Sequence, residues 1–414
     1  MKKGVLLVLV ALFMAWSCKK ERESISLAEG DWWATMQVDA NHKLPFTFNI
    51  SKSGEGKYKL EMYNADEVVV VDEISFSNDS IHIQMPVFEG YIAGVFTEKQ
   101  IEGSFIKESL DRIVPFEAIH GKKERFSIKE EPIQNISGIW ETYFEPGTDD
   151  QYAAKGLFVQ QGSKIEGTFR TTTGDYRYLE GVVDGDSLKL SAFDGAHVFL
   201  FTAKISKDSL EGIFFSGNHS KEKFIAKRNE AFELPDANSL TYLKEGYDSF
   251  EFSFPNRQGA SVSLNDSQFQ NKPVVVQIMG SWCPNCLDET KFYVDYLKEN
   301  PDLDIEFIAL AFEYAKTEDS AWKSIERLKG RIDIPYPILL AQYGTSNKKL
   351  ANEKLPMLNH VLSYPTTIFI DRRGEVIKIH TGFNGPATGS KYEEYVIEFE
   401  KTIQELTQEE VSAI

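Results

Sequence analysis

Two cysteines lie close together in the second half of the chain, in the run Gly-Ser-Trp-Cys-Pro-Asn-Cys that ends at Cys286. The sulfurs of such a pair alternate between two thiols and a disulfide, and the thiolate form attacks disulfides in other molecules. The chain has 414 residues but three cysteines, too few for a framework of structural disulfides. We therefore predict that Cys283 and Cys286 form a redox-active disulfide in an enzyme.

The elements around this pair give each sulfur a role. The apolar run 274–279 predicts a buried strand, and apolar residues three or four apart predict a helix over 286–300. Cys283 then lies where the helix begins, and the unpaired N–H groups and the dipole of a helix favour a thiolate at that place. We predict that Cys283 is the nucleophile and that Cys286, one helical turn further on, is the resolving thiol.

The sequence around the pair resembles the TlpA/ResA-like thioredoxins over about 248–408. The matching residues are Phe252-x-Phe254, Gly259, Val262-x-Leu264, Lys272-Pro273, Gly280-Ser281-Trp282-Cys283, Glu289 and Tyr364-Pro365-Thr366-Thr367. The resemblance implies an α/β thioredoxin fold, a thiol-disulfide oxidoreductase, a location outside the cytoplasm and a membrane tether. It also implies a cis bond before Pro365 and a backbone edge at Tyr364 where an extended substrate pairs, so Trp282, Tyr364 and Pro365 are the expected substrate-binding residues.

Glu289 is the candidate acid-base residue, because it lies three residues beyond Cys286 on the same predicted helix. The alternative is a surface or capping carboxylate. Many thioredoxins carry a buried Asp six residues before the nucleophile, where this chain has Gln277, which does not titrate. A proline that often follows the Glu by two residues is replaced by Lys291.

The direction of electron flow is left open by the dipeptide between the cysteines. The resemblance favours a reductase of protein disulfides that draws electrons from a membrane donor and serves cytochrome c biogenesis or the repair of secreted thiols. We expect no cofactor and no metal, since zinc requires two further ligands at a compatible spacing. The alternative function is a cell-envelope binding module, in which the first half of the chain binds a ligand or partner and the thioredoxin domain is supporting.

The rest of the chain divides into recognisable parts. Strands at 274–279, 305–312 and 366–370 and helices at 286–300, 319–329 and 391–408 predict the thioredoxin-like domain over 246–414, after a linker at 230–245. Before the linker, short alternating strands predict two antiparallel β units, 28–126 and 127–229, each a sandwich or a barrel.

An internal repeat supports the two β units. Gly30-Asp31-Trp32-Trp33 corresponds to Gly138-Ile139-Trp140, Phe88-Glu89-Gly90 to Phe193-Asp194-Gly195, and 101–105 to 210–214, all in the same order. The aromatic residues Trp32, Trp33, Trp140 and Phe193 are expected in the sheet cores rather than at a ligand mouth.

The first residues predict export. Residues 1–17 combine two lysines with a short apolar run, as in a lipoprotein signal peptide, and Cys18 after small residues is the predicted lipidation site. A cleaved signal with an incidental cysteine is the alternative. Residues 18–27 would be a tether to the membrane in the bacterial cell envelope, at the periplasmic or outer-membrane face. The net charge of -18 disfavours nucleic acid as a partner.

Overall fold

The structure is a computed structural model that describes residues 26–54 and 56–408. The predicted signal peptide 1–17, Cys18 and most of the predicted tether lie outside these residues. No helix in the described part of the chain is both long and apolar enough to cross a membrane.

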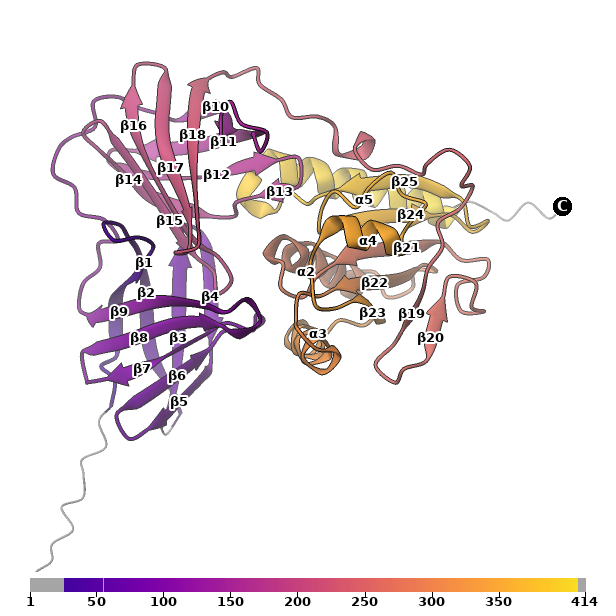
Figure 1. Ribbon diagram of the computed structural model, residues 1–414, viewed down its shortest axis with the longest axis horizontal. Coiled ribbons are helices and arrows are strands. Elements are labelled where there is room, and N and C mark those ends of the chain that lie inside the picture. Colours follow the sequence, from indigo (N-terminus) through magenta and orange to yellow (C-terminus); the bar gives the residue numbers. More distant parts are fainter. Residues whose placement is uncertain (1–25, 55, 409–414) are drawn as a thin grey trace, which may run out of the picture.

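The first β unit is one antiparallel sheet (Figure 1). Its strands are β1 (Gly30–Gln37), β2 (Lys43–Gly54), β3 (Lys57–Asn64), β4 (Glu67–Val71), β5 (Glu73–Ser77), β6 (Ser80–Gln84), β7 (Tyr91–Phe96), β8 (Gln100–Lys107) and β9 (Arg112–His120). They pair in the order β4-β3-β2-β1-β9-β8-β7-β6-β5, so that β1 joins the two ends of the unit by pairing with β9. Strands β4 and β5 are the free edges of this curled sheet.

The second β unit closes into a barrel. Its strands are β10 (Gly138–Phe144), β11 (Tyr152–Gln161), β12 (Lys164–Thr171), β13 (Gly174–Asp175), β14 (Leu179–Asp184), β15 (Ser187–Phe193), β16 (Val198–Ser206), β17 (Ser209–Ser216) and β18 (Ser220–Arg228). The order is β11-β10-β18-β17-β16-β15-β14-β12-β13, and β11 also pairs with β12, which closes the ring. Closure leaves no unpaired ladder between these strands.

The repeat in the sequence is a repeat of structure. Trp32 in β1 donates from Nε1 to the carbonyl of Ala28 at 3.1 Å, and Trp140 in β10 donates to the carbonyl of Ile136 at 2.8 Å, four residues back in both units. Both tryptophans are fully buried. Gly30 and Gly138 precede them with φ angles of 112° and 117°, a conformation that a side chain would strain.

The two β units share a core. Buried side chains of β15 to β17, including Phe193, Leu200 and Phe215, belong to the apolar cluster of the first unit. Trp33 is half-buried, with its indole nitrogen bonded to the carbonyl of Arg125 at 2.9 Å. The Arg125 guanidinium is itself buried against the second unit, where Nη1 donates to the Ser191 carbonyl at 2.9 Å.

The C-terminal part has a five-stranded sheet in the order β23-β22-β21-β24-β25 (Figure 1). The strands are β21 (Val274–Met279), β22 (Glu306–Phe312), β23 (Ile338–Gln342), β24 (Thr366–Ile370) and β25 (Val376–Thr381), preceded by a hairpin of β19 (Ser253–Pro255) and β20 (Ser261–Ser263). Strands β21, β22 and β23 are parallel, and β24 is antiparallel to both β21 and β25. The helices are α2 (Pro284–Glu299), α3 (Glu318–Ile332), α4 (Lys348–Lys354) and α5 (Ser390–Gln408).

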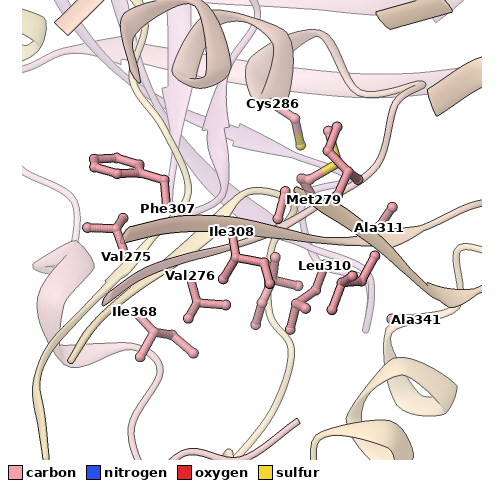
Figure 2. Packing of buried hydrophobic residues seen from close by; sticks show 14 of the residues in the cluster. Val275, Val276, Met279, Cys286, Phe307, Ile308, Leu310, Ala311, Ala341 and Ile368 are labelled. Carbon is pink, nitrogen blue, oxygen red and sulfur yellow. The ribbon is translucent and has the colours of Figure 1, made fainter. Parts of the chain in front are cut away.

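The predicted fold class is thus confirmed: two tandem antiparallel β units precede an α/β thioredoxin fold. The core of this last domain lies on both faces of the sheet. Figure 2 shows Val276, Ile308 and Ile368, which pair in register, on one face, and Cys286 of α2 approaching the other. Every residue of β21 is buried, so the strand that leads to the cysteines is held by packing on both sides.

Candidate active site

Cys283 lies at the N-terminus of α2, in the loop that follows β21. It is the N-cap residue, with extended backbone, and Pro284 occupies the first turn of the helix. Its Sγ accepts a hydrogen bond from the backbone N–H of Cys286 at 3.3 Å, and its thiol donates to the carbonyl of Tyr364 at 3.3 Å. A negative sulfur here would face free N–H groups and the positive end of the helix dipole.

Cys286 is one turn inside the helix and differs from Cys283 in burial. Its exposed fraction is 0 %, against 7 % for Cys283. Burial, assisted by the neighbouring sulfur, raises the pKa of the Cys286 thiol. Both cysteines are free thiols in the structure. Of the two sulfurs, Cys286 is thus the more deeply buried and the one whose thiol is the harder to deprotonate.

Glu289 lies beneath the cysteines and is completely buried. Its carboxylate accepts from Gln277 Nε2 at 2.8 Å and from Thr367 Oγ1 at 3.0 Å, and Tyr395 also donates to it at 3.4 Å. Burial outweighs these hydrogen bonds and raises the pKa of Glu289 to about 7. The carboxyl group is therefore not a surface group, and it interacts electrostatically with Cys286.

The buried carboxyl predicts a stability effect that depends on pH. The folded pKa of Glu289 is about 7 and its usual value is 4.5, so the folded protein binds this proton more tightly, and stability falls as pH rises from 4.5 to 7. We therefore compare the free energy of unfolding of Glu289→Gln with that of wild type at pH 5 and at pH 8. The value for the variant minus the value for wild type should increase by up to about 3 kcal/mol from pH 5 to pH 8. Urea unfolding at both pH values measures this. Glu299→Gln, at the exposed end of the same helix, is the control, and an equal pH response in both variants would contradict the assignment.

The predicted substrate-binding residues lie around Cys283. The bond between Tyr364 and Pro365 is cis. Trp282 packs edge-on against the Tyr364 ring, with centroids 5.7 Å apart, and donates from Nε1 to the carbonyl of Phe312 at 2.9 Å. The structure therefore brings Trp282, Tyr364 and Pro365 together with Cys283, and Glu289 lies on the buried side.

A second buried carboxyl was not anticipated from the sequence. Glu313 follows β22, is 1 % exposed, and accepts from Ser281 through the backbone N–H at 2.7 Å and the hydroxyl at 2.8 Å. Burial raises its pKa to about 7. It holds the loop that carries Trp282 and Cys283. Its position at the carboxyl end of a parallel strand, beside the end of β21, is the signal that would have revealed it.

The β units reach the active-site helix through Arg177, which the sequence did not single out. This buried guanidinium pairs with Glu67 of the first unit, with Asp194 of the second and with Asp288 of α2. It also donates to the carbonyl of Pro284 at 3.0 Å, in the first turn of α2. One side chain thus joins all three parts of the protein directly behind the two cysteines.

Further hydrogen bonds join the second β unit to the loops of the active site. Asn285, between the cysteines, donates from Nδ2 to the carbonyl of Asp175 at 3.1 Å. The Asp175 carboxyl accepts from the N–H of Gly385 at 2.6 Å, and Ser363, just before Tyr364, donates to the carbonyl of Thr173 at 2.7 Å. The loop around β13 therefore contacts both the segment that contains Cys283 and the segment that leads to Tyr364.

A cavity of about 740 Å³ lies where the three parts meet, and Cys283 lines it. The first β unit contributes residues of 105–114, the second contributes residues of 171–176 and 196–199, and the last domain contributes residues 282–285 and 362–364. This volume falls within the range of small-molecule sites. Access to Cys283 is therefore shaped by all three parts of the described chain.

Comparison with known proteins agrees with this geometry. Residues 244–396 match the model of the Redoxin family. We call this part of the chain the Redoxin domain after that match. Among curated proteins, it is similar to thioredoxin-like protein YneN of Bacillus subtilis, with 28% identity over 140 residues, 34% of this chain and 73% of the relative. It is also similar to thiol-disulfide oxidoreductase ResA of Halalkalibacterium halodurans, with 24% identity over 144 residues, 34% of this chain and 69% of the relative.

A solved structure also resembles the Redoxin domain. It is a putative thiol:disulfide interchange protein DsbE from Chlorobium tepidum, with 17% identity, a TM-score of 0.29, and coverage of 39% of this chain and 99% of that one. The match to the Redoxin family and the similarity to YneN confirm the expectation of a thioredoxin-fold oxidoreductase.

Proposed function

We propose that this protein is an extracytoplasmic thiol-disulfide oxidoreductase that reduces disulfides in other proteins through Cys283 and Cys286. The arrangement of the two sulfurs carries the proposal: Cys283 starts α2 and lines the cavity, while Cys286 is fully buried one turn behind it. An accessible thiol backed by an inaccessible one is what a two-step exchange requires.

In the first step the Cys283 thiolate attacks one sulfur of the substrate disulfide, forms a mixed disulfide and releases the other substrate sulfur as a thiolate. In the second step the Cys286 sulfur attacks Cys283, which breaks the mixed disulfide and releases the remaining substrate thiolate. Two electrons pass to the substrate, and the pair becomes a disulfide. Glu289, with a pKa of about 7, takes the Cys286 proton at neutral pH. Trp282 and the Tyr364-Pro365 segment form the docking edge for the substrate backbone.

The location belongs to the same proposal. Residues 1–17 direct export, Cys18 carries the lipid, and 18–27 tether the folded part to a membrane of the cell envelope. A membrane donor then returns electrons to the Cys283–Cys286 disulfide, in cytochrome c biogenesis or thiol repair. ResA-like relatives support an extracytoplasmic site of action.

The reductase direction is tested by the reduction potential of the whole folded chain. We expect equilibration with glutathione or dithiothreitol to give a value near that of thioredoxin, about -270 mV, and we expect the reduced protein to reduce insulin. A potential near about -120 mV, as in strong oxidants, would contradict the reductase direction while leaving disulfide exchange intact.

A further inference from the structure

The cavity at Cys283 is lined by more positive than negative side chains, although the chain carries a net charge of -18. Its cationic residues are Lys107 and Arg112 of the first β unit and Lys348 at the start of α4. The only carboxylate of the described lining is Asp175, which is buried and bonded to the backbone N–H groups of Gly385 and Arg177. The positive charge in the cavity is therefore not neutralised by its own walls.

Lys107 is the most unusual of these cations. It is 91 % buried, because its exposed fraction is 9 %, and its ammonium group makes one hydrogen bond within the described chain, to the carbonyl of Ala196 at 3.3 Å. An ammonium group has three donors. Glu89 attracts it electrostatically but forms no ion pair with it, and burial lowers the pKa of Lys107 to about 8. A buried cation with unused donors is costly unless something else binds it.

Arg112 and Lys348 also have free donors. Neither side chain forms an ion pair or a hydrogen bond with any residue that the structure describes. Other cations that join the β units to the Redoxin domain are paired: Arg331 with Asp72 at 3.0 Å and Lys316 with Asp111 at 2.7 Å. Lys107, Arg112 and Lys348 thus face the cavity that Cys283 lines without a carboxylate partner among the described residues.

Electrostatic contacts place these cations around the sulfur. Lys348 interacts with Cys283, and Arg112 interacts with Tyr314, whose ring lies 5.3 Å from the Trp282 ring and 5.9 Å from Lys107 Nζ. Two of the three cations come from the first β unit, so this unit contributes charge to the active site of a domain far along the chain.

We propose that Lys107, Arg112 and Lys348 form a binding subsite for carboxylate groups that flank the substrate disulfide, so that the β units select anionic disulfides for Cys283. The inference rests on the proposed function, because it assigns a substrate class to the same site. The reaction is unchanged: the anionic disulfide accepts two electrons and leaves as two thiols, and Cys283 and Cys286 become a disulfide.

The test compares three small disulfides as oxidants of the reduced whole chain: dithiodiglycolate, which is anionic, hydroxyethyl disulfide, which is neutral, and cystamine, which is cationic. The rate of loss of the two protein thiols is measured at about 0.15 M ionic strength, where the Debye length of about 8 Å screens the distant net charge but not the cavity. A second arm uses disulfide-linked peptides with Glu, Gln or Lys beside the cysteine, which separates a polypeptide source of the carboxylates from a small-molecule source.

Each rate is expressed relative to the rate with the neutral probe. On this scale we expect the anionic probe to react at least about 10-fold faster than the cationic probe, and we call this ratio the preference. Lys107→Met and Arg112→Met should each lower this preference about threefold while leaving the neutral rate unchanged, since neither residue touches Cys283. Lys348→Met should lower the preference and also the neutral rate, because Lys348 is the cavity cation that interacts electrostatically with Cys283. Lys349→Met, at the exposed next position in α4 and outside the cavity lining, is the matched control and should change neither rate.

Equal preference in wild type and in the three cavity variants would overturn the subsite. If only the peptides showed the preference for anionic disulfides, the carboxylates that bind here would belong to a polypeptide. If the small disulfides and the peptides both showed it, a negative charge beside the disulfide would be sufficient for selection. If wild type failed to react with the neutral probe, the proposed function itself would fall, so the two failures are distinct.

Discussion

Replacing Cys283 with Ser is expected to reduce disulfide reduction by the whole chain to the uncatalysed background, a loss of at least about 1000-fold, because a hydroxyl does not supply a thiolate at neutral pH. Cys286→Ser should behave differently. The Cys283 sulfur, which lines the cavity, would still attack, but the mixed disulfide would persist, since no second sulfur lies behind it to release the substrate.

Insulin reduction and mass spectrometry of the trapped species measure both effects. In Cys286→Ser, Cys283 should carry the substrate in stoichiometric amounts, and in Cys283→Ser no adduct should form on Cys286, which is fully buried. An adduct on Cys286 would reverse the assignment of nucleophile and resolving thiol. Ser281→Ala, in the same loop, keeps both sulfurs and is the control for loop disturbance.

The second large effect is expected at Arg177. Replacing it with Met should lower the free energy of unfolding by about 3–5 kcal/mol, the usual cost of removing one partner from a buried ionic network. The reason is that the carboxylates of Glu67, Asp194 and Asp288 would remain buried, with exposed fractions of 12%, 4% and 13%, without the cation that joins them. Arg177→Lys should recover part of the loss, since a single ammonium group does not match the fork geometry of guanidinium.

Urea unfolding followed by circular dichroism and by tryptophan fluorescence measures this effect. Arg257→Met is the control, because Arg257 pairs with Glu326 on the surface, where both side chains are about half exposed (48% and 54%); its loss should stay below about 0.5 kcal/mol. If Arg177→Met were no less stable than Arg257→Met, Arg177 would not hold the three parts together. The Met variant should also reduce insulin more slowly, because the first turn of α2 loses the bond to the carbonyl of Pro284.

Local patterns predicted the elements of the Redoxin domain closely. The strand expected at 274–279 has the bounds Val274–Met279, because a continuous apolar run suits a strand buried on both faces. The helix expected over 286–300 begins earlier, at Pro284, since proline suits the first turn and Cys283 serves as the cap. Helix α4 (Lys348–Lys354) was not predicted, because seven residues carry too little periodicity to be detected.

The sequence did not decide how the β units close. In the second unit the pairing of β11 with β12 completes a ring, whereas β4 and β5, the edge strands of the first unit, do not pair with each other and its core extends onto Phe193 and its neighbours. The repeat predicts equivalent strands, and Trp32 and Trp140 are indeed equivalent. Edge pairing depends on packing between units, which alternation along one strand does not encode.

The sequence by itself determined the thiol-disulfide chemistry, because the features that specify it are local. The spacing of Cys283 and Cys286, together with the strand-to-helix boundary between 279 and 284, places one sulfur at the helix N-cap and the other in the first turn of the helix. Only the tertiary structure decided what surrounds that chemistry. Glu313, Arg177 and the cavity cations Lys107 and Arg112 come from elements far apart in the chain. Burial and long-range packing bring them together, and these depend on the whole fold rather than on any spacing of residues.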